Sequence, residues 1–410
     1  MLIKTLEEST ERFTCGTKAA NLAYVYSSDR YKVPKGVVLS TSFYRALFNK
    51  DIQPDINTLV SKCDYTDIGQ ILETIHKISL FSRQIRQSLY EIQPQGLNKP
   101  WAIRSSNAME DLDKISFAGV YKSFTGVYPV RGIHIHIKHV HASLYSPIAL
   151  QYRHKHKVQQ TDLTMPVIIQ EYIKGHYSGV LFTRHPDTSD DLTYIETAEG
   201  NCENIVSGAV VPNVFLVKNA KVIDSKVIDS KVIPYAFYPS NEILYRLEAI
   251  GKELEDKFQK PLDIEWTVKD DQIYLLQVRP ITVLPRFELQ KPTGKSKAIL
   301  TGNAIRSLYT APIVKGRAFV FKSINDIDDF RPGDILVCDN TTEEMEPLMM
   351  LAGGLITNHG VRTSHAAIRS REYGLPAIVG TLHATDKIRH NLPLELRFNE
   401  NPYKGNVYDG

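Results

Sequence analysis

Cysteine is scarce in this sequence, and long apolar runs are missing. Four cysteines occur among 410 residues, and no two of them have a CxxC spacing. We therefore expect a reduced chain in the cytoplasm rather than a disulfide framework. The absence of any run of about 18 apolar residues argues against a membrane-spanning helix. The first residues, MLIKTLEEST, lack the apolar core of a secretory signal.

An excess of charge of one sign is also lacking. Lys and Arg number 49 and Asp and Glu number 46, which leaves a formal charge of +3. So small an excess argues against nucleic acid or an acidic membrane surface as the partner. The apolar fraction of 42% and the charged fraction of 23% are typical of a globular protein, and the length predicts two or three domains.

Three common catalytic motifs are absent as well. The sequence contains no GxxxxGK[ST] loop, no HExxH and no GxSxG. Nucleotide chemistry in this chain would therefore need another way of binding phosphate.

Short β-rich runs are present from Trp101 onwards and alternate with amphipathic stretches. The runs are WAIRSS, PVIIQEYI, SGVLFT, LTYIET and QIYLLQV. This alternation predicts a mixed α/β fold over residues 1–283. The polar, proline-containing segment 284–300 is interpreted as a linker. Residues 301–410 are expected to form a second compact domain, with FRPGDILVCD, AGGLITN and LPAIVG as strands around one helix.

Two segments of biased composition are interpreted as structural. KVIDS occurs twice between Lys221 and Ser230, which is too few units for a solenoid and predicts a surface hairpin or loop. The stretch HIHIKHVH places His134, Lys138 and His141 on one face of a helix. Because it contains no carboxylate or cysteine, a solvated helix face is favoured over a metal site.

A histidine lies at a predicted helix start in the segment Gly353 to Gly380. Thr363 or Ser364 is a suitable N-cap, so the helix is expected to begin at His365; Gly374 then ends it. The positive end of the helix dipole disfavours an imidazolium and attracts an anion. A neutral imidazole facing a phosphate is suited to nucleophilic catalysis. A structural histidine in the first turn is the alternative, and His359 is a competitor without a cap.

Two groups of residues near the N-terminus are suited to binding polyphosphate. The turn Cys15 to Lys18 precedes a predicted helix, and its lysine would meet an anion there. Arg104 ends a predicted strand, where a guanidinium can contact phosphate through two hydrogen bonds. Gly119 and Gly126 in the following hairpin-like segment permit a close approach of the backbone. A surface arginine beside a plain hairpin remains the alternative.

A third group contains carboxylates. In a strand, Asp263 and Glu265 point to the same face. If the run containing Gln277 and Arg279 pairs with it in antiparallel fashion, those two side chains also share a face. Two carboxylates and an amide oxygen are suitable ligands for Mg²⁺, and Arg279 could contact phosphate.

These motifs together resemble the phosphoenolpyruvate synthase and pyruvate phosphate dikinase group. The matching N-terminal segments are GTKAANLA, VPKGVVLSTSFYRALF, WAIRSSNAMEDLDKISFAGVYKSF, SGVLFTRHP, and DIEW with LQVRP. The C-terminal match is PGDILV followed by TSHAAI and REYGLPAIVG. The resemblance implies an α/β ATP-grasp domain followed by a small, swivelling phosphohistidine domain.

The resemblance also implies roles for single residues. His365 would carry the phosphoryl group. ATP would be bound by Lys18, Arg104, Arg279 and Gly119, and Mg²⁺ by Glu265 and Gln277. Supporting positions would be Asp263, Thr363 and Ser364.

The activity implied is a dikinase reaction with ATP and Mg²⁺. ATP would give AMP and phosphate, and the β-phosphoryl group would pass through His365 to a small-molecule acceptor. Three departures from the group bear on this. The sequence has no phosphoenolpyruvate- or pyruvate-binding barrel up to Gly410 and no extra acceptor domain between its two parts. In the segment Glu196 to Gly208, Asn201 and Cys202 replace the usual Leu-Gly. A phosphocarrier subunit of a split system and a nucleotide-binding pseudoenzyme are the alternatives, and retention of the histidine argues against the latter.

Overall fold

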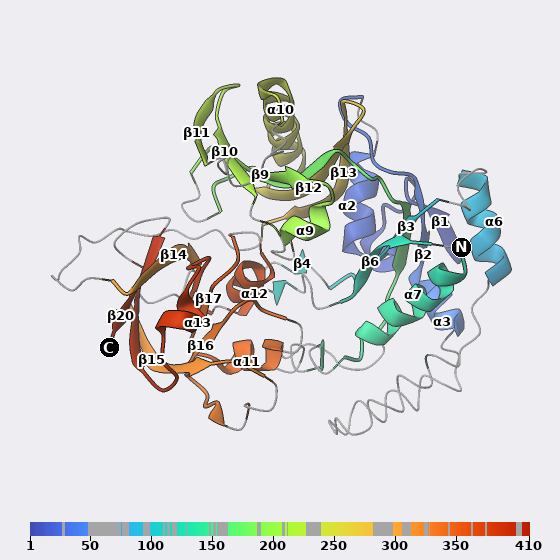
Figure 1. Ribbon diagram of the computed structural model, residues 1–410. Helices are drawn as coiled ribbons and strands as arrows, with labels where there is room; N and C mark the ends of the chain where they lie inside the picture. Colours follow the sequence, from blue (N-terminus) through green and yellow to red (C-terminus); the bar gives the residue numbers. More distant parts are fainter. Residues whose placement is uncertain are drawn as a thin grey trace. The chain divides into compact units, whose positions relative to one another are not determined.

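The computed structural model in Figure 1 divides the chain into two compact units, Met1–Lys174 with Lys269–Arg279, and Gly175–Val268 with Pro280–Gly410. No helix in the described part of the chain is long and apolar enough to cross a membrane. The structure describes all residues except 27–28, 48–74, 76–81, 93–98, 110, 113–114, 117–120, 129, 147–148, 151–152, 154–162, 187–189, 207–209, 211, 227–238, 282–297, 306–312, 324–326, 328, 343–344, 362–363, 374 and 399–403.

The first unit contains an antiparallel sheet with the strand order β1-β2-β7-β3-β6. Its apolar central strands are buried along nearly their whole length, as the continuous run VIIQE of β7 illustrates. The strands are β1 (Ile3–Thr5), β2 (Gly36–Leu39), β7 (Val167–Glu171), β3 (Trp101–Ser105) and β6 (Ser123–Val127). The helices are α1 (Arg12–Cys15), α2 (Thr17–Val25), α3 (Thr41–Leu47), α6 (Ser82–Ile92) and α7 (Val130–Ser143). The same region contains the short pair β4 (Asp111–Leu112) and β5 (Ile115–Ser116), and β13 (Gln272–Pro280).

Helix α7 contains the histidine-rich stretch, and one of its histidines corrects the prediction of a solvated face. His134 and Lys138 are partly exposed, but the His141 side chain is 1% exposed. Its ring packs edge-on against Tyr44 with the ring centroids 5.1 Å apart. Burial lowers the pKa of His141 to about 3, so this histidine is a neutral part of the core.

The second unit contains an antiparallel sheet in which β11-β10-β9-β8-β12 are neighbours. Its strands are β11 (Val222–Lys226), β10 (Asn213–Val217), β9 (Thr193–Glu199), β8 (Tyr177–Phe182) and β12 (Leu262–Lys269). Its helices are α9 (Cys202–Val206) and α10 (Asn241–Phe258), the latter capped by the Ser240 side chain. The first KVIDS copy belongs to β11, which forms a hairpin with β10; most of the second copy lies outside the described residues.

The C-terminal part of the second unit is a closed barrel, coloured orange to red in Figure 1. Its strands, in order around the barrel, are β14 (Leu300–Ile305), β18 (Ala377–Val379), β17 (Gly354–Thr357), β16 (Ile335–Cys338), β15 (Ile313–Val320), β19 (Pro393–Arg397) and β20 (Lys404–Asp409). The helices α11 (Glu346–Leu351), α12 (His365–Tyr373) and α13 (Ala384–Lys387) accompany them.

The three predicted strands are confirmed, but the prediction of one helix is wrong and the remaining barrel strands were not predicted. The strands inferred from PGDILV, GGLIT and PAIVG are present as the parallel set β16, β17 and β18. The other barrel strands lack a continuous apolar run: β15, for example, is exposed or half-buried from Ile313 to Arg317 and buried only from Ala318 to Val320. Closure removes the free sheet edges that three strands alone would leave.

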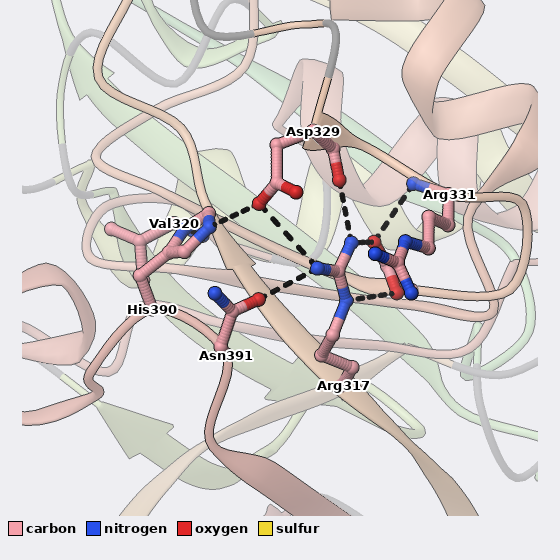
Figure 2. A network of polar contacts seen from close by, with 7 residues as sticks. Arg317, Val320, Asp329, Arg331, His390 and Asn391 are labelled. Atoms are coloured by element: carbon pink, nitrogen blue, oxygen red, sulfur yellow. Dashed lines mark hydrogen bonds and ion pairs between the residues drawn. The ribbon is translucent and has the colours of Figure 1, made fainter.

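A polar network around Arg317 of β15 fixes the segment that leads into β16, as Figure 2 shows. The guanidinium donates to Asp334 through Nε (3.0 Å) and Nη2 (2.5 Å) and to Asn391 (2.6 Å). His390 Nε2 lies 2.7 Å from Asp329, and its Nδ1 accepts the Val320 N–H at 3.2 Å. Because Asp334 directly precedes β16, this network sets the start of the strand whose other end leads to the candidate site.

Candidate functional site

His365 is the first residue of α12, as predicted. The Ser364 carbonyl accepts the Ile368 N–H at 2.9 Å, and its hydroxyl accepts the Ala367 N–H at 3.4 Å. Ser364 is thus the N-cap, and its side chain is buried. Thr363, the other predicted cap, lies outside the described residues.

Both nitrogens of the His365 ring contact a side chain. Nδ1 is 2.9 Å from Thr341 Oγ1, and Nε2 is 3.1 Å from Glu346 Oε1. Thr341 follows the end of β16, and Glu346 lies in the first turn of α11. The His365 side chain is 22% exposed, so the ring is held by two partners and still reaches solvent.

Glu346 is a buried carboxylate with two further partners on α12. Arg369 Nη2 lies 2.9 Å from its Oε1, and the Tyr373 hydroxyl donates to its Oε2 at 2.8 Å. Burial alone would raise the pKa of Glu346, but the hydrogen bond with His365, the charge of Arg369 and the Tyr373 hydroxyl outweigh it and lower the pKa. The residue is therefore an ionised carboxylate at neutral pH.

The ends of β16 and β17 lie at one edge of the barrel, because parallel pairing brings the carboxyl ends of both strands together. Asn358, directly after β17, donates to Asp339 at 2.8 Å and accepts the Thr385 N–H at 3.0 Å. His359, the competing histidine, lies 3.5 Å from Asp339 and is 54% exposed. Among the residues that the structure describes, His359 has neither a helix cap nor a buried partner comparable to Glu346.

The predicted phosphate-binding turn in the first unit is packed against the end of β3. Gly16 has φ = 81°, and a Cβ at this position would lie 1.4 Å from the Ser106 carbonyl oxygen, so only glycine fits. The Ser106 hydroxyl accepts the Ala19 N–H at 3.0 Å. Lys18, in the first turn of α2 as predicted, donates to Ser105 Oγ at 3.1 Å.

Arg104 connects β3 to β13. Its Nη1 donates to the Leu276 carbonyl at 3.1 Å, and Asn21 of α2 donates to the Val278 carbonyl at 3.0 Å. Gln277 lies between these two carbonyl groups in the sequence, and Arg279 follows. Hydrogen bonds in the first unit therefore join α2, β3 and β13, the elements that carry the predicted residues Lys18, Arg104, Gln277 and Arg279. Gly119 lies outside the described residues.

The predicted magnesium ligands are oxygen donors on β12 and β13. Asp263 and Glu265 lie two residues apart on β12, opposite Phe182 and Val180 of β8, and so share a face as predicted. No group of three or more His, Cys, Asp or Glu suited to a metal occurs among the described residues. Glu265 and the Gln277 amide oxygen suit Mg²⁺, which commonly takes few protein ligands and completes its shell with substrate phosphates and water. Glu265 lies in the second unit and Gln277 in the first, and their joint binding of the ion stays a prediction.

In the segment after β9, where Asn201 and Cys202 replace the usual Leu-Gly, the cysteine has a structural role. Gly200 has φ = 83° and turns the chain, and α9 begins at Cys202. The Cys202 thiol is buried and donates to the Gly179 carbonyl at 3.3 Å. Cys202 therefore packs against the sheet.

Sequence reasoning missed the partners of His365. Glu346 is 19 residues and Thr341 is 24 residues away in sequence, and the segment TTEEMEP offers three glutamates with nothing to distinguish them. Arg369 and Tyr373 could have been grouped with His365 because positions four and eight residues later lie on the same helix face.

Comparison with known proteins supports the interpretation of both regions. The family described as pyruvate phosphate dikinase, AMP/ATP-binding domain, matches residues 13–298, and the PEP-utilising enzyme, mobile domain, matches residues 330–396. A probable phosphoenolpyruvate synthase of Methanothermobacter thermautotrophicus is 30% identical over 96% of this chain and 62% of the relative. The phosphoenolpyruvate synthases of Deinococcus radiodurans and Escherichia coli are 32% and 28% identical over 88% and 87% of this chain.

The chain spans 62%, 51% and 51% of the length of these three relatives. The matched domains cover its N-terminal and C-terminal parts, and the second contains His365. The chain therefore belongs to the phosphoenolpyruvate synthase and pyruvate phosphate dikinase family.

Proposed function

We propose that this chain is an ATP-dependent phosphotransferase of the dikinase type that works through phosphorylated His365. The observation that carries the proposal is the presence, in one chain, of an AMP/ATP-binding domain and a mobile domain with a partly exposed His365 at the start of α12. We further propose that residues 1–283 and 301–410 act as separate domains joined by 284–300, so that the histidine can move between donor and acceptor.

In this proposal a ring nitrogen of His365 bonds to the β-phosphorus of ATP while the bond from that phosphorus to the α–β bridging oxygen breaks, and this oxygen leaves with AMP. Water then attacks the γ-phosphorus, the bond from the γ-phosphorus to the β–γ bridging oxygen breaks, and phosphate leaves, so that the β-phosphoryl group stays on His365. Positive charge on Lys18, Arg104 and Arg279 binds the phosphates, with Gly119 allowing close backbone approach. Glu265 and Gln277 would hold Mg²⁺, which would supply positive charge to neutralise the phosphates, and Asp263 would support those ligands. Ser364 caps the helix that the histidine begins, and Thr363 stays a predicted supporting position.

The acceptor in this proposal is a small molecule, and the alternative is a separate acceptor-binding subunit. Comparing product formation by the chain alone with formation after addition of such a subunit distinguishes the two. We place the protein in the cytoplasm, a proposal supported by the free, buried thiols of Cys15, Cys202 and Cys338.

Product analysis with labelled ATP tests the proposal. We expect AMP and phosphate when Mg²⁺ is present, and an acid-labile phosphoryl adduct on His365 by mass spectrometry. Formation of ADP alone, or an adduct elsewhere in the chain, would contradict it.

A further inference from the structure

We propose that Glu346 is the positioning residue of His365: a buried carboxylate that holds the Nε2 proton and so fixes the tautomer and the orientation of the ring. The inference deepens the proposed function, since it concerns the histidine proposed to be phosphorylated. It rests on the contacts between α11 and α12 within the barrel.

The first step of the argument concerns which ring nitrogen carries hydrogen. An ionised carboxylate can only accept a hydrogen bond, so the 3.1 Å contact between Glu346 Oε1 and Nε2 requires a proton on Nε2. In the neutral ring the lone pair is then on Nδ1, where the Thr341 hydroxyl can donate at 2.9 Å. Both partners thus fit the same tautomer of His365, the one with hydrogen on Nε2.

The second step concerns what keeps Glu346 in place. Its carboxylate is held by Arg369, whose side chain is 1% exposed, and by the Tyr373 hydroxyl. Both partners lie on α12, the helix that His365 begins. A carboxylate fixed from the same helix cannot follow the ring if the ring turns, so the hydrogen bond favours a single ring orientation.

The third step separates positioning from proton abstraction. The partners of Glu346 lower its pKa, and a carboxylate with a lowered pKa is a poor general base near neutral pH. Its contribution is therefore a fixed negative charge beside the ring, comparable to the orienting carboxylate of a hydrolase triad. Phosphoryl transfer to either ring nitrogen requires the hydrogen bond at that nitrogen to break. If the ring moves away from Glu346, the carboxylate keeps its ion pair with Arg369 and its hydrogen bond with Tyr373.

Nitrogen-15 NMR of the unphosphorylated full chain, labelled in histidine, tests this directly and needs no turnover. The His365 signals are assigned among the 13 histidines by their loss in His365→Gln. We expect the wild-type ring to show a protonated Nε2 and an unprotonated Nδ1 at mildly alkaline pH. In Glu346→Gln and Glu346→Ala the two shifts should move towards each other as both tautomers become populated.

The rate of adduct formation with ATP and Mg²⁺ is measured on the same proteins. We expect Glu346→Gln and Glu346→Ala to slow it by about 10- to 100-fold, by analogy with residues that orient metal-bound histidines, with the KM for ATP unchanged. Tyr373→Phe removes one hydrogen bond and keeps the Arg369 pair; it should slow the reaction less. This variant keeps the test informative if Glu346 variants fail to fold because Arg369 loses its ion pair with the carboxylate.

Glu395→Gln is the matched control. Glu395 is another buried carboxylate of the barrel; it lies 2.9 Å from Lys315 and accepts a hydrogen bond from Arg397. It lies on β19 and not beside His365. This variant should leave the His365 signals and the rate unchanged. Glu346 variants with wild-type shifts, or with a rate equal to or above that of the wild type, would overturn the inference. Absence of any adduct in the wild-type protein would instead count against the proposed function, and the NMR result would still decide the tautomer.

Discussion

The two regions proposed to bind phosphate are built in opposite ways. The histidine site is completed within one barrel, where both ring contacts come from residues at most 24 positions away. The predicted ATP residues depend on β13, whose carbonyl groups hold residues from the N-terminus, such as Asn21, 257 positions earlier. The comparison teaches that the surroundings of His365 are organised locally, whereas the predicted ATP residues depend on the chain returning to the first unit through β13.

Charge differs between the two regions as well. The first unit presents Lys18 and Arg104, cations held by neutral groups such as Ser105 Oγ and the Leu276 carbonyl. In the barrel, a buried carboxylate faces a partly exposed imidazole. Cations suit the binding of ATP phosphates, and the carboxylate suits the control of a histidine, so each region is suited to a different half of the proposed task.

The largest effect on this comparison is expected from removing the proposed nucleophile. We expect His365→Gln to abolish the acid-labile adduct and AMP formation while the Kd for ATP stays as in the wild type, because the predicted ATP residues lie outside the barrel. Isothermal titration and product analysis measure the two effects. His359→Gln, which removes an exposed histidine beside Asp339, should behave like the wild type. Normal turnover by His365→Gln would disprove the assigned nucleophile.

The next largest effect is expected at the predicted metal ligand. Glu265→Gln should raise the Mg²⁺ concentration needed for half-maximal adduct formation by about 10- to 100-fold, since an amide is a weaker ligand than a carboxylate. Magnesium titrations of the rate check this. Asp224→Asn, at an exposed position of β11, serves as control. An unchanged magnesium dependence of Glu265→Gln would remove this residue from the site.

A smaller effect should follow from removing one cation of the first unit. Lys18→Met should weaken ATP binding about tenfold, the loss of one charge-assisted contact, and leave the barrel's unfolding unaltered. Lys35→Met, at an exposed position of the same unit, is the control. If both variants bind ATP equally well, Lys18 is not a phosphate ligand.

The smallest effect is expected on stability alone. Asp334→Asn removes the ion pair with Arg317 and should lower the free energy of unfolding by about 1–3 kcal/mol. Burial would raise the pKa of Asp334, but Arg317 and the Arg331 N–H outweigh it and lower the pKa below the ordinary 3.8. Because the folded pKa is lowered, the stabilisation is present above about pH 4 and is lost as the pH falls through the folded value.

Thermal unfolding at several pH values measures this difference. The gap between wild type and Asp334→Asn should be full at neutral pH and close in acid. Asp386→Asn, whose side chain is 72% exposed, should show no gap at any pH. A gap that stays constant down to pH 2 would mean that the charge of Asp334 does not stabilise the barrel.

Much of the fold near the sites was predictable from the sequence. The strands β3, β7, β8, β9 and β16 to β18 coincide with apolar β-rich runs, and α2 and α12 begin where glycine and the Ser364 cap indicate. The four remaining barrel strands were missed because their patterns are half-polar. His141 was assigned to a solvated face because periodicity gives the face of a residue but not what covers that face.

Local chemistry in the sequence determined where helices begin, which glycines must turn and which histidine is capped, because those features depend on neighbours a few residues apart. Only the tertiary structure decided that Glu346, among three nearby glutamates, meets Nε2 of His365 and that Arg104 meets the backbone of β13. These contacts join segments brought together by barrel closure and sheet formation, and no local pattern records which distant side chain fills the space beside a ring.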